Sequence, residues 1–261
     1  MKKVALLSFL LTASAYAQLT APAPQILVPA AGSVAGLNGT FFRSDIAIFN
    51  YRQSAQNVVF QWLPQGQSGL AETLTQITIP GLSGIISEDF VGSRLLRSGL
   101  GSIVISAVGQ NGQIDPLGAL FVTSRIWTPQ AGNSQGTVSQ TFPTIDTSRI
   151  NSSNVAILGQ RISAQYRANV GIVNLSTTEQ TFEVLQSSDD PTFAPVVQTV
   201  TVPPRALQQV TLLNNRSAVL QVRVRALTAL DPQQWVAYGS SIDNVTGDSW
   251  SSLGVVTVVT P

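Results

Sequence analysis

Two pairs of adjacent acids, Glu88-Asp89 and Asp189-Asp190, are the densest groups of potentially reactive side chains in this sequence. Two carboxylates are the minimum for glycoside hydrolysis, where they flank the scissile bond about 5 to 9.5 Å apart. Residues adjacent in sequence rarely face each other across such a cleft. The start of a helix accounts for the first pair, and an exposed turn before Pro191 accounts for the second. We therefore expect neither pair to be catalytic.

The residue types that are missing exclude most other catalytic chemistry. The chain of 261 residues has no His and no Cys, which excludes Ser-His-Asp and Cys-His catalysis, zinc sites of the usual ligands and disulfide bonds. Its only lysines, Lys2 and Lys3, lie in an expected signal peptide, so the exported chain also lacks Ser-Lys and Schiff-base chemistry. We expect a protein that is not an enzyme and that uses no cofactor and no metal ion.

One loop carries oxygen ligands of the kind that calcium prefers. Residues 243–248 (DNVTGD) contain two aspartates, but they lack the alternating acids and the terminal Glu of a known calcium loop. A hairpin turn is the simpler interpretation.

Four tryptophans offer flat rings on which a sugar could stack. Trp62 and Trp235 lie within strand-like segments and are expected in the core. Trp127 and Trp250 lie next to loops, so they are the candidate ligand-binding residues.

A nine-residue motif occurs twice, as residues 42–50 (FRSDIAIFN) and residues 166–174 (YRANVGIVN). An arginine beside an aromatic ring suits ligand stacking or carboxylate pairing. Its occurrence at the same place in both copies favours a structural role instead. We expect the arginines of this repeat motif to lie over an aromatic ring and bond local carbonyls, and its final asparagines to cap a turn. These four residues are Arg43, Asn50, Arg167 and Asn174.

Two weaker matches extend the repeat, residues 77–80 with 200–203 and residues 120–126 with 236–242. Within each copy, apolar and polar residues alternate with the period of two that is typical of half-buried strands. Short strands separated by Gly, Pro and Asn-Gly turns over about 100 to 125 residues are typical of an immunoglobulin-like sandwich.

The predicted fold is therefore all-β, with two tandem immunoglobulin-like β-sandwich domains that arose by an internal duplication. We divide the chain into a signal peptide over residues 1–17, a first repeat over residues 18–145 and a second repeat over residues 150–261. One short helix is expected in the first repeat. Ser87 would cap its first turn, Arg94 and Arg97 would lie in its last turns, and Gly99 would end it.

The N-terminus predicts export. Two lysines, an apolar run over residues 4–11 and the sequence Ala15-Tyr16-Ala17 make a secretory signal peptide that is cleaved after Ala17. The apolar run is far shorter than the ~20 residues that span a bilayer, and no later stretch reaches that length, so we expect no transmembrane segment. The predicted location is secreted, extracellular or on the cell surface, with the periplasm as an alternative.

The surface is expected to carry little charge. Charged residues make up 10% of the chain, against about 25% in an average domain. Without residues 1–17, 12 arginines remain against 13 acids, which gives a formal charge of −1. Scattered arginines provide no basic stripe, so nucleic acid is not an expected partner. The expected partners are surface proteins, polysaccharide, or a second copy that pairs through the apolar, β-branched residues 253–260.

With its two motif copies, the chain resembles a group of uncharacterised secreted bacterial proteins built from paired immunoglobulin-like repeats. The shared mark is an aromatic residue, Arg, a small residue, Asp or Asn, and then alternating aliphatic residues that end in Asn. The resemblance covers roughly residues 26–250 and implies the fold and export, but no catalytic residue.

The functional prediction is an exported, non-enzymatic β-sandwich protein with an adhesive, surface-scaffold or assembly role. One alternative is a carbohydrate-binding module that uses Trp127 or Trp250. Another is a periplasmic chaperone-like protein of two domains. Such chaperones anchor a subunit's C-terminus with an Arg and a Lys, and the exported chain has no Lys.

Overall fold

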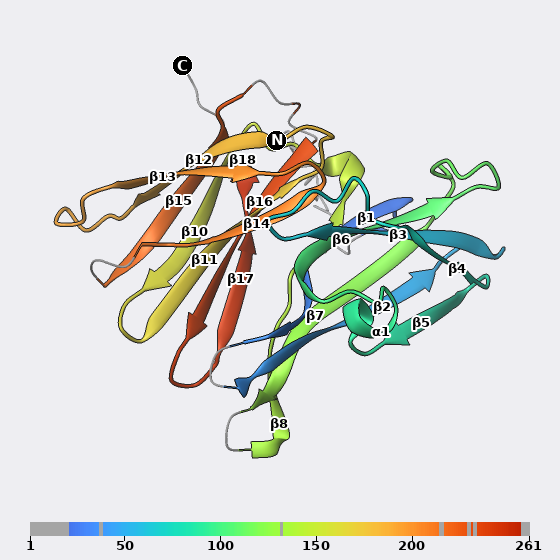
Figure 1. Ribbon diagram of the computed structural model, residues 1–261, viewed down its shortest axis with the longest axis horizontal. Helices are drawn as coiled ribbons and strands as arrows, with labels where there is room; N and C mark the ends of the chain where they lie inside the picture. The colour runs from blue at the N-terminus through green and yellow to red at the C-terminus, as the bar shows by residue number, and fades with distance from the viewer. Residues whose placement is uncertain are drawn as a thin grey trace, which may run out of the picture.

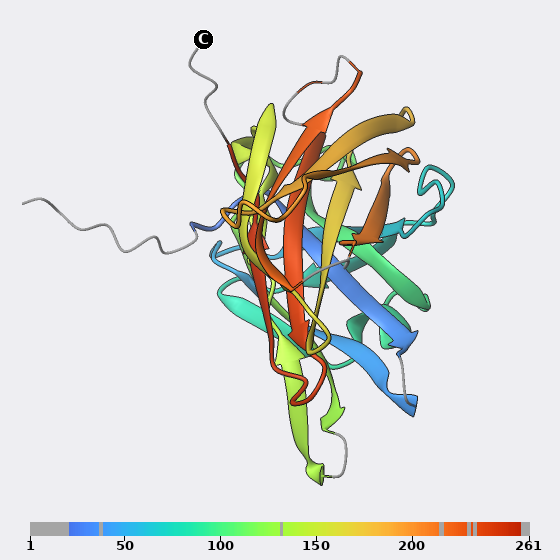
Figure 2. The same ribbon diagram turned by 90° about the vertical axis from the view of Figure 1, so that its left-hand side faces the viewer.

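The computed structural model describes residues 21–36, 39–130, 133–213, 217–228, 231 and 234–256. The expected signal peptide lies outside these residues. Where the chain is described, its regular structure is nearly all β-strand, with one short α-helix and one 3-10 turn, which confirms the all-β prediction. Figure 1 shows the strands gathered into two bodies, coloured blue to green and yellow to red. In the side view of Figure 2 the second body lies in front of the first.

The first repeat contains nine strands in one continuous sheet that folds over into two layers. One layer has the order β4-β3-β6-β1, with β9 also paired to β1, and the other has the order β5-β2-β7-β8. The strands are β1 (Gln25–Ala35), β2 (Phe41–Asn50), β3 (Gln56–Pro64), β4 (Thr75–Ile79), β5 (Ser83–Ser87), β6 (Gly99–Val108), β7 (Leu120–Gln130), β8 (Asn133–Gln140) and β9 (Ile145–Asp146).

The second repeat has the same topology in two separate sheets, in the orders β13-β12-β15-β10-β18 and β14-β11-β16-β17. Each strand corresponds to the strand nine places earlier in the chain. The strands are β10 (Asn154–Ile162), β11 (Tyr166–Asn174), β12 (Gln180–Ser187), β13 (Val196–Val202), β14 (Ala206–Thr211), β15 (Ala218–Ala226), β16 (Trp235–Asp243), β17 (Ser249–Leu253) and β18 (Val255–Val256).

The strand pairing corrects one part of the expected repeat alignment. Asn50 pairs with Leu120, and its counterpart Asn174 pairs with Trp235. The counterpart of Leu120 is therefore Trp235, whereas the sequence match assigned it to Val236. The match slipped by one residue because both strands are apolar on both faces at this point, so alternation could not fix the register.

Each repeat encloses its own core between its two layers. In the first repeat the core includes Ile46 and Ile48 from β2 and Ile103 and Ile105 from β6. In the second it includes Val170 and Ile172 from β11 together with Trp235, which is 1% exposed. Trp62 and Trp235 are both buried, as predicted.

A third apolar cluster joins the two repeats. On the outer face of the β3-β6-β1 layer lie Leu27, Leu63 and Val104, which pack against the outer face of the β14-β11-β16 layer. Strands β6 and β16 are consequently buried on both faces. The second-repeat members of this internal interface include Val173, Leu175, Leu207, Val236 and Tyr238. The backbone N–H of Gly66 also donates to the carbonyl of Leu207 at 2.9 Å. The repeats thus form one packed body.

The helix differs from its prediction. Helix α1 (Phe90–Ser93) is a single turn capped by Asp89, whose carboxylate accepts from the N–H of Gly92. The assignment of Ser87 as the cap was wrong, because Ser87 ends β5, where it pairs with Ile46. Arg94 is the residue that follows the turn. Gly99 does not end the helix but begins β6.

Residues Leu253 to Val256 pair within their own chain. Leu253 pairs with Tyr238 in β16, and Val255 and Val256 pair with Ala156 and Val155 in β10. This part of the run predicted to recruit a second copy therefore pairs within the chain, where β17 and β18 are the last strands of the two second-repeat sheets, and residues 257–260 lie outside the described ones. No helix in the described part of the chain is long and apolar enough to cross a membrane.

Candidate functional site

An uncovered apolar surface lies on the outer side of β2 and β7. Because Ile46 and Ile48 point into the core, Phe49 points outward, and it pairs with Phe121 on β7. The ring centroid of Tyr51 lies 4.8 Å from that of Phe49 and 6.4 Å from that of Phe121. Ile86 on β5 is 80% exposed on the same side. We call these four residues the aromatic face.

Three of the four aromatic-face residues correspond to positions that the second repeat buries, whereas the counterpart of Ile86 by strand register is Gln209. Phe49 and Phe121 are paired, and so are their counterparts Val173 and Val236. Tyr51 follows Asn50 as Leu175 follows Asn174. Whereas the second-repeat residues lie in the internal interface, Tyr51 is 52% exposed. The first repeat thus has an apolar docking surface in the same place, and no described residue covers it.

Trp127 lies on the same layer as the aromatic face, but its side chain already contacts other residues of the chain. Its indole N–H donates to Asp45 at 2.7 Å, and the guanidinium carbons of Arg43 and Arg125 lie 5.7 and 5.9 Å from its ring centroid. Arg125 also pairs with Asp45 at 2.9 Å. A sugar that stacked on Trp127 would have to displace these arginines.

The two motif arginines occupy equivalent positions but make different contacts. Arg43 lies over the ring of Phe41 at 4.7 Å and is 4.0 Å from Asp89. Arg167 instead donates to the side-chain oxygen of Asn244, and burial lowers the pKa of its guanidinium. Arg43 thus lies over an aromatic ring, as expected. The described side-chain contact of Arg167 is with Asn244 instead, and the ring of Tyr166 lies near Arg161.

The motif asparagines form the same hydrogen-bond network in both repeats. The amide of Asn50 donates to the carbonyls of Ser54, Ile79 and Pro80 at 3.0 to 3.2 Å, and its oxygen accepts from the N–H of Arg52. The amide of Asn174 donates in the same way at 2.8 to 3.2 Å, and its oxygen accepts from the N–H two residues later. Each asparagine is fully buried and ties its turn to the end of a distant strand. The second set of carbonyls belongs to Thr178, Val202 and Pro203.

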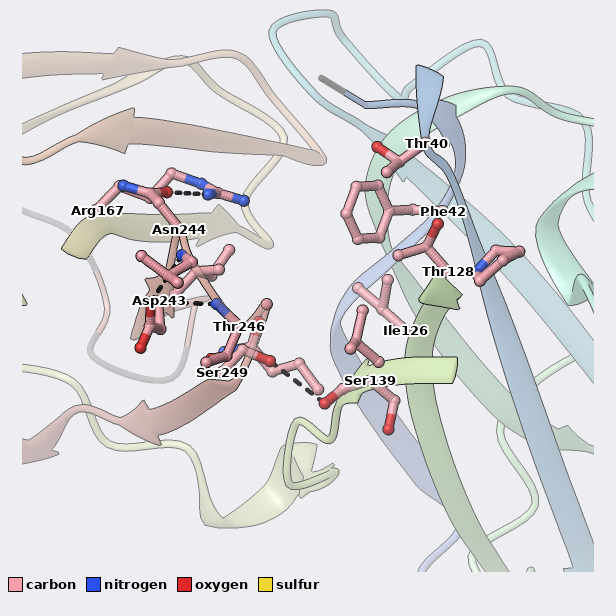
Figure 3. A pocket seen from close by; sticks show the side chains of 16 residues that line it. Thr40, Phe42, Ile126, Thr128, Ser139, Arg167, Asp243, Asn244, Thr246 and Ser249 are labelled. Carbon is pink, nitrogen blue, oxygen red and sulfur yellow. Dashed lines mark hydrogen bonds between the residues drawn. The ribbon is translucent and has the colours of Figure 1, made fainter. Parts of the chain in front are cut away.

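A cleft of about 530 Å³ opens where the two repeats meet. Figure 3 shows Phe42, Ile126 and Thr128 on its first-repeat wall, facing Arg167 and the turn at residues 243–247. Below them, the hydroxyl of Ser249 donates to the carbonyl of Ser139 at 3.2 Å and links the two repeats. The cleft therefore has walls from both repeats.

Trp250 lines a separate, shallower hollow of about 450 Å³. Its ring meets that of Tyr166 edge-on with centroids 6.1 Å apart. Arg161, Asp243 and Asp248 also line this hollow. Aromatic rings beside carboxylates and a guanidinium supply both a stacking surface and hydrogen-bond partners for a sugar.

The acidic residues considered for catalysis or metal binding serve local turns. Asp89 caps α1, and Asp190 accepts from the N–H of Thr192 at 2.8 Å. Asp243 accepts from the N–H groups of Val245 and Thr246, and these bonds lower the pKa of its carboxyl. The segment 243–248 is thus a tight turn, as the simpler interpretation predicted.

The sequence prediction did not identify the aromatic face or the cleft. The signal for the face was present, because Phe49 and Phe121 occupy outward positions in strands that otherwise alternate. The cleft had no comparable signal, since its walls come from separate segments of both repeats, between residues 40 and 249, that only the internal interface brings together.

No protein-family profile matches this sequence, and no curated protein is significantly similar to it. Among solved structures, the chain is similar to the major pilin of Streptococcus pyogenes, with 11% sequence identity and a TM-score of 0.23 over 90% of this chain and 94% of the pilin. A likeness at this level says nothing about function, and the resemblance to secreted paired-repeat proteins stays a prediction. The function proposed below depends on the geometry of the sites.

Proposed function

We propose that this protein is an exported, non-enzymatic scaffold protein that assembles through the aromatic face of its first repeat. The observation that carries the proposal is the uncovered state of a surface whose counterpart in the second repeat is buried. An apolar sheet face of this kind marks an interaction site on a protein surface. The low share of charged residues in the whole chain, 10%, offers little repulsion between copies.

The partner proposed for this face is the same face of a second copy. The counterpart surface already binds a sheet of this protein, because the second repeat docks on the first through it. The outer face of β12 and β15 is a poorer partner, since it carries Arg223 and the ion pair of Glu183 with Arg225 at 2.8 Å. Pairing through one shared face gives a two-fold dimer, the commonest form of homo-oligomer.

Substitution of Ile86 by Thr tests this proposal. Ile86 is 80% exposed and Thr keeps the strand propensity, so folding should be unaffected while the apolar contact is weakened. In sedimentation or light scattering over a concentration series, we expect the wild-type chain to dimerise and Ile86→Thr to shift the midpoint at least tenfold to higher concentration. Val245→Thr is the matched control, because Val245 is 79% exposed on the other repeat. A wild-type chain that stays monomeric at all concentrations would contradict the proposal.

Carbohydrate binding in the Trp250 hollow is the second candidate function. It is favoured by the pairing of Trp250 with Tyr166 beside two carboxylates. Titration with a panel of polysaccharides should then give heat that Trp250→Ala removes and Trp127→Ala leaves unchanged. Absence of heat with every polysaccharide would remove this candidate.

A further inference from the structure

We infer that the cleft between the repeats binds a small carboxylate with an apolar body. The inference is independent of the aromatic face, which lies on the outer side of β2 and β7, whereas the cleft lies at the junction of the repeats. Its volume of about 530 Å³ falls within the range of about 300 to 1,000 Å³ of small-molecule sites.

The positive charge of Arg167 in the cleft favours an anionic ligand. Arg167 forms no salt bridge with any acid among the described residues, and its one described side-chain bond goes to the neutral side chain of Asn244. Figure 3 shows its guanidinium directed from Asn244 toward Phe42, into the open space. A guanidinium has five N–H donors, so one bond to Asn244 leaves donors for a carboxylate. Partial burial strengthens such a pair compared with one in water.

The other charged group in the lining does not neutralise Arg167. The carboxylate of Asp243 accepts from the N–H groups of Val245 at 2.8 Å and Thr246 at 3.4 Å and from the amide of Gln165 at 2.9 Å. In Figure 3 it points away from Phe42, toward its own turn. An anion at Arg167 would therefore lie on the opposite side of the turn from Asp243.

The walls set the shape and polarity of the ligand's body. The first-repeat wall is largely apolar, with Phe42, Ile126, Pro129 and Val138, and Val245 adds a further apolar side chain from the second repeat. Thr128 stands in this wall with a buried hydroxyl that has no hydrogen-bond partner in the described part of the chain. A ligand with one carboxylate at one end and a ring or branched chain at the other fits this arrangement, whereas phosphate or sulfate would leave the apolar wall uncovered.

Calorimetric titration of the exported chain, residues 18–261, tests the inference. The probes are 3-phenylpropionate, its amide, inorganic phosphate and the peptide acetyl-Ala-Phe with a free C-terminal carboxylate. We expect both carboxylates to bind at least tenfold more tightly than the amide and than phosphate. Tighter binding of the peptide would identify a chain terminus as the source of the carboxylate, and tighter binding of phenylpropionate would identify a free acid. Binding of neither carboxylate would overturn the inference.

Two variants locate the site. Arg167→Gln should weaken carboxylate binding at least tenfold, and Arg94→Gln, which removes the same charge from an exposed position outside the cleft, should leave it unchanged. Asn244→Asp keeps Arg167 but places a carboxylate on its guanidinium, so it should also abolish binding even if Arg167→Gln fails to fold. Undiminished binding to Asn244→Asp would place the ligand elsewhere and refute the assignment.

Discussion

At the scale of single residues, the motif asparagines show how one side chain can organise a turn. Asn50 and Asn174 each bind three backbone carbonyls and one backbone N–H, and both side chains are fully buried. Because an unsatisfied buried polar group costs about 1 to 3 kcal/mol, each asparagine stabilises the fold far more than an exposed amide does.

Replacement of either asparagine by Ala should lower the free energy of unfolding by about 3 kcal/mol or more. Asn57→Ala is the control, since Asn57 makes an exposed side-chain bond with Thr78 and its loss should cost less than about 1 kcal/mol. Denaturant titration followed by circular dichroism measures all three. An Asn50→Ala chain as stable as Asn57→Ala would show that the network does not hold the turn.

Gln186, unlike the motif asparagines, is a buried amide without hydrogen-bond partners among the described residues. It is fully buried, and neither its amide nitrogen nor its oxygen has a partner among the described residues. Its counterpart in the first repeat, by strand register, is the core residue Trp62. Gln186→Met should raise the free energy of unfolding by about 1 to 2 kcal/mol, because it removes a desolvated amide at similar volume. A decrease in the same denaturant titration would indicate that the amide binds a buried water.

At the scale of strands, one glycine makes the internal interface fit together. Gly171 on β11 pairs with Tyr238 on β16, and a Cβ at position 171 would lie 2.1 Å from the Tyr238 ring. The equivalent pair in the first repeat is Ala47 with Thr123, where the smaller partner leaves room for a methyl group. The exchange of Ala for Gly therefore accompanies the exchange of Thr for Tyr.

Gly171→Ala should lower the midpoint of thermal unfolding strongly, because the ring of Tyr238 is fully buried and has no space to move. The double variant Gly171→Ala with Tyr238→Thr recreates the first-repeat pair and should recover part of the loss. Additive losses in this double-mutant cycle would show that the two positions are not coupled.

The strands were largely predictable from sequence, whereas their surroundings were not. Alternation in β2 and the repeated motif were enough to find the all-β fold, because both are local signals. Burial of β6 and β16 on both faces depends on the contact between repeats, which pairs residues far apart in sequence. The cap of α1 was missed because Asp89 adopts a left-handed backbone conformation with φ of 46°, which Ser87 and Glu88 gave no reason to expect.

At the scale of the whole molecule, we expect the internal interface to make the two repeats unfold cooperatively. Leu207 is fully buried between the repeats and packs within the third apolar cluster. We expect the chain to unfold in a single calorimetric transition, with equal van't Hoff and calorimetric enthalpies. Leu207→Ser should weaken the contact and separate this transition into two, whereas Leu158→Ser, at a position 60% exposed, should not. Two transitions in the wild-type chain would mean that the repeats are energetically independent.

The internal interface also imposes an order on events during synthesis. Because chains are made from the N-terminus at about 5–20 residues per second, the first repeat is complete roughly ten seconds before the last strand of the second. During that interval the side chains of Leu27, Leu63 and Val104 face water, since the residues that cover them have yet to be made. The second repeat therefore covers an apolar sheet surface of the first, and we expect a product that stopped near residue 150 to leave this surface exposed to solvent.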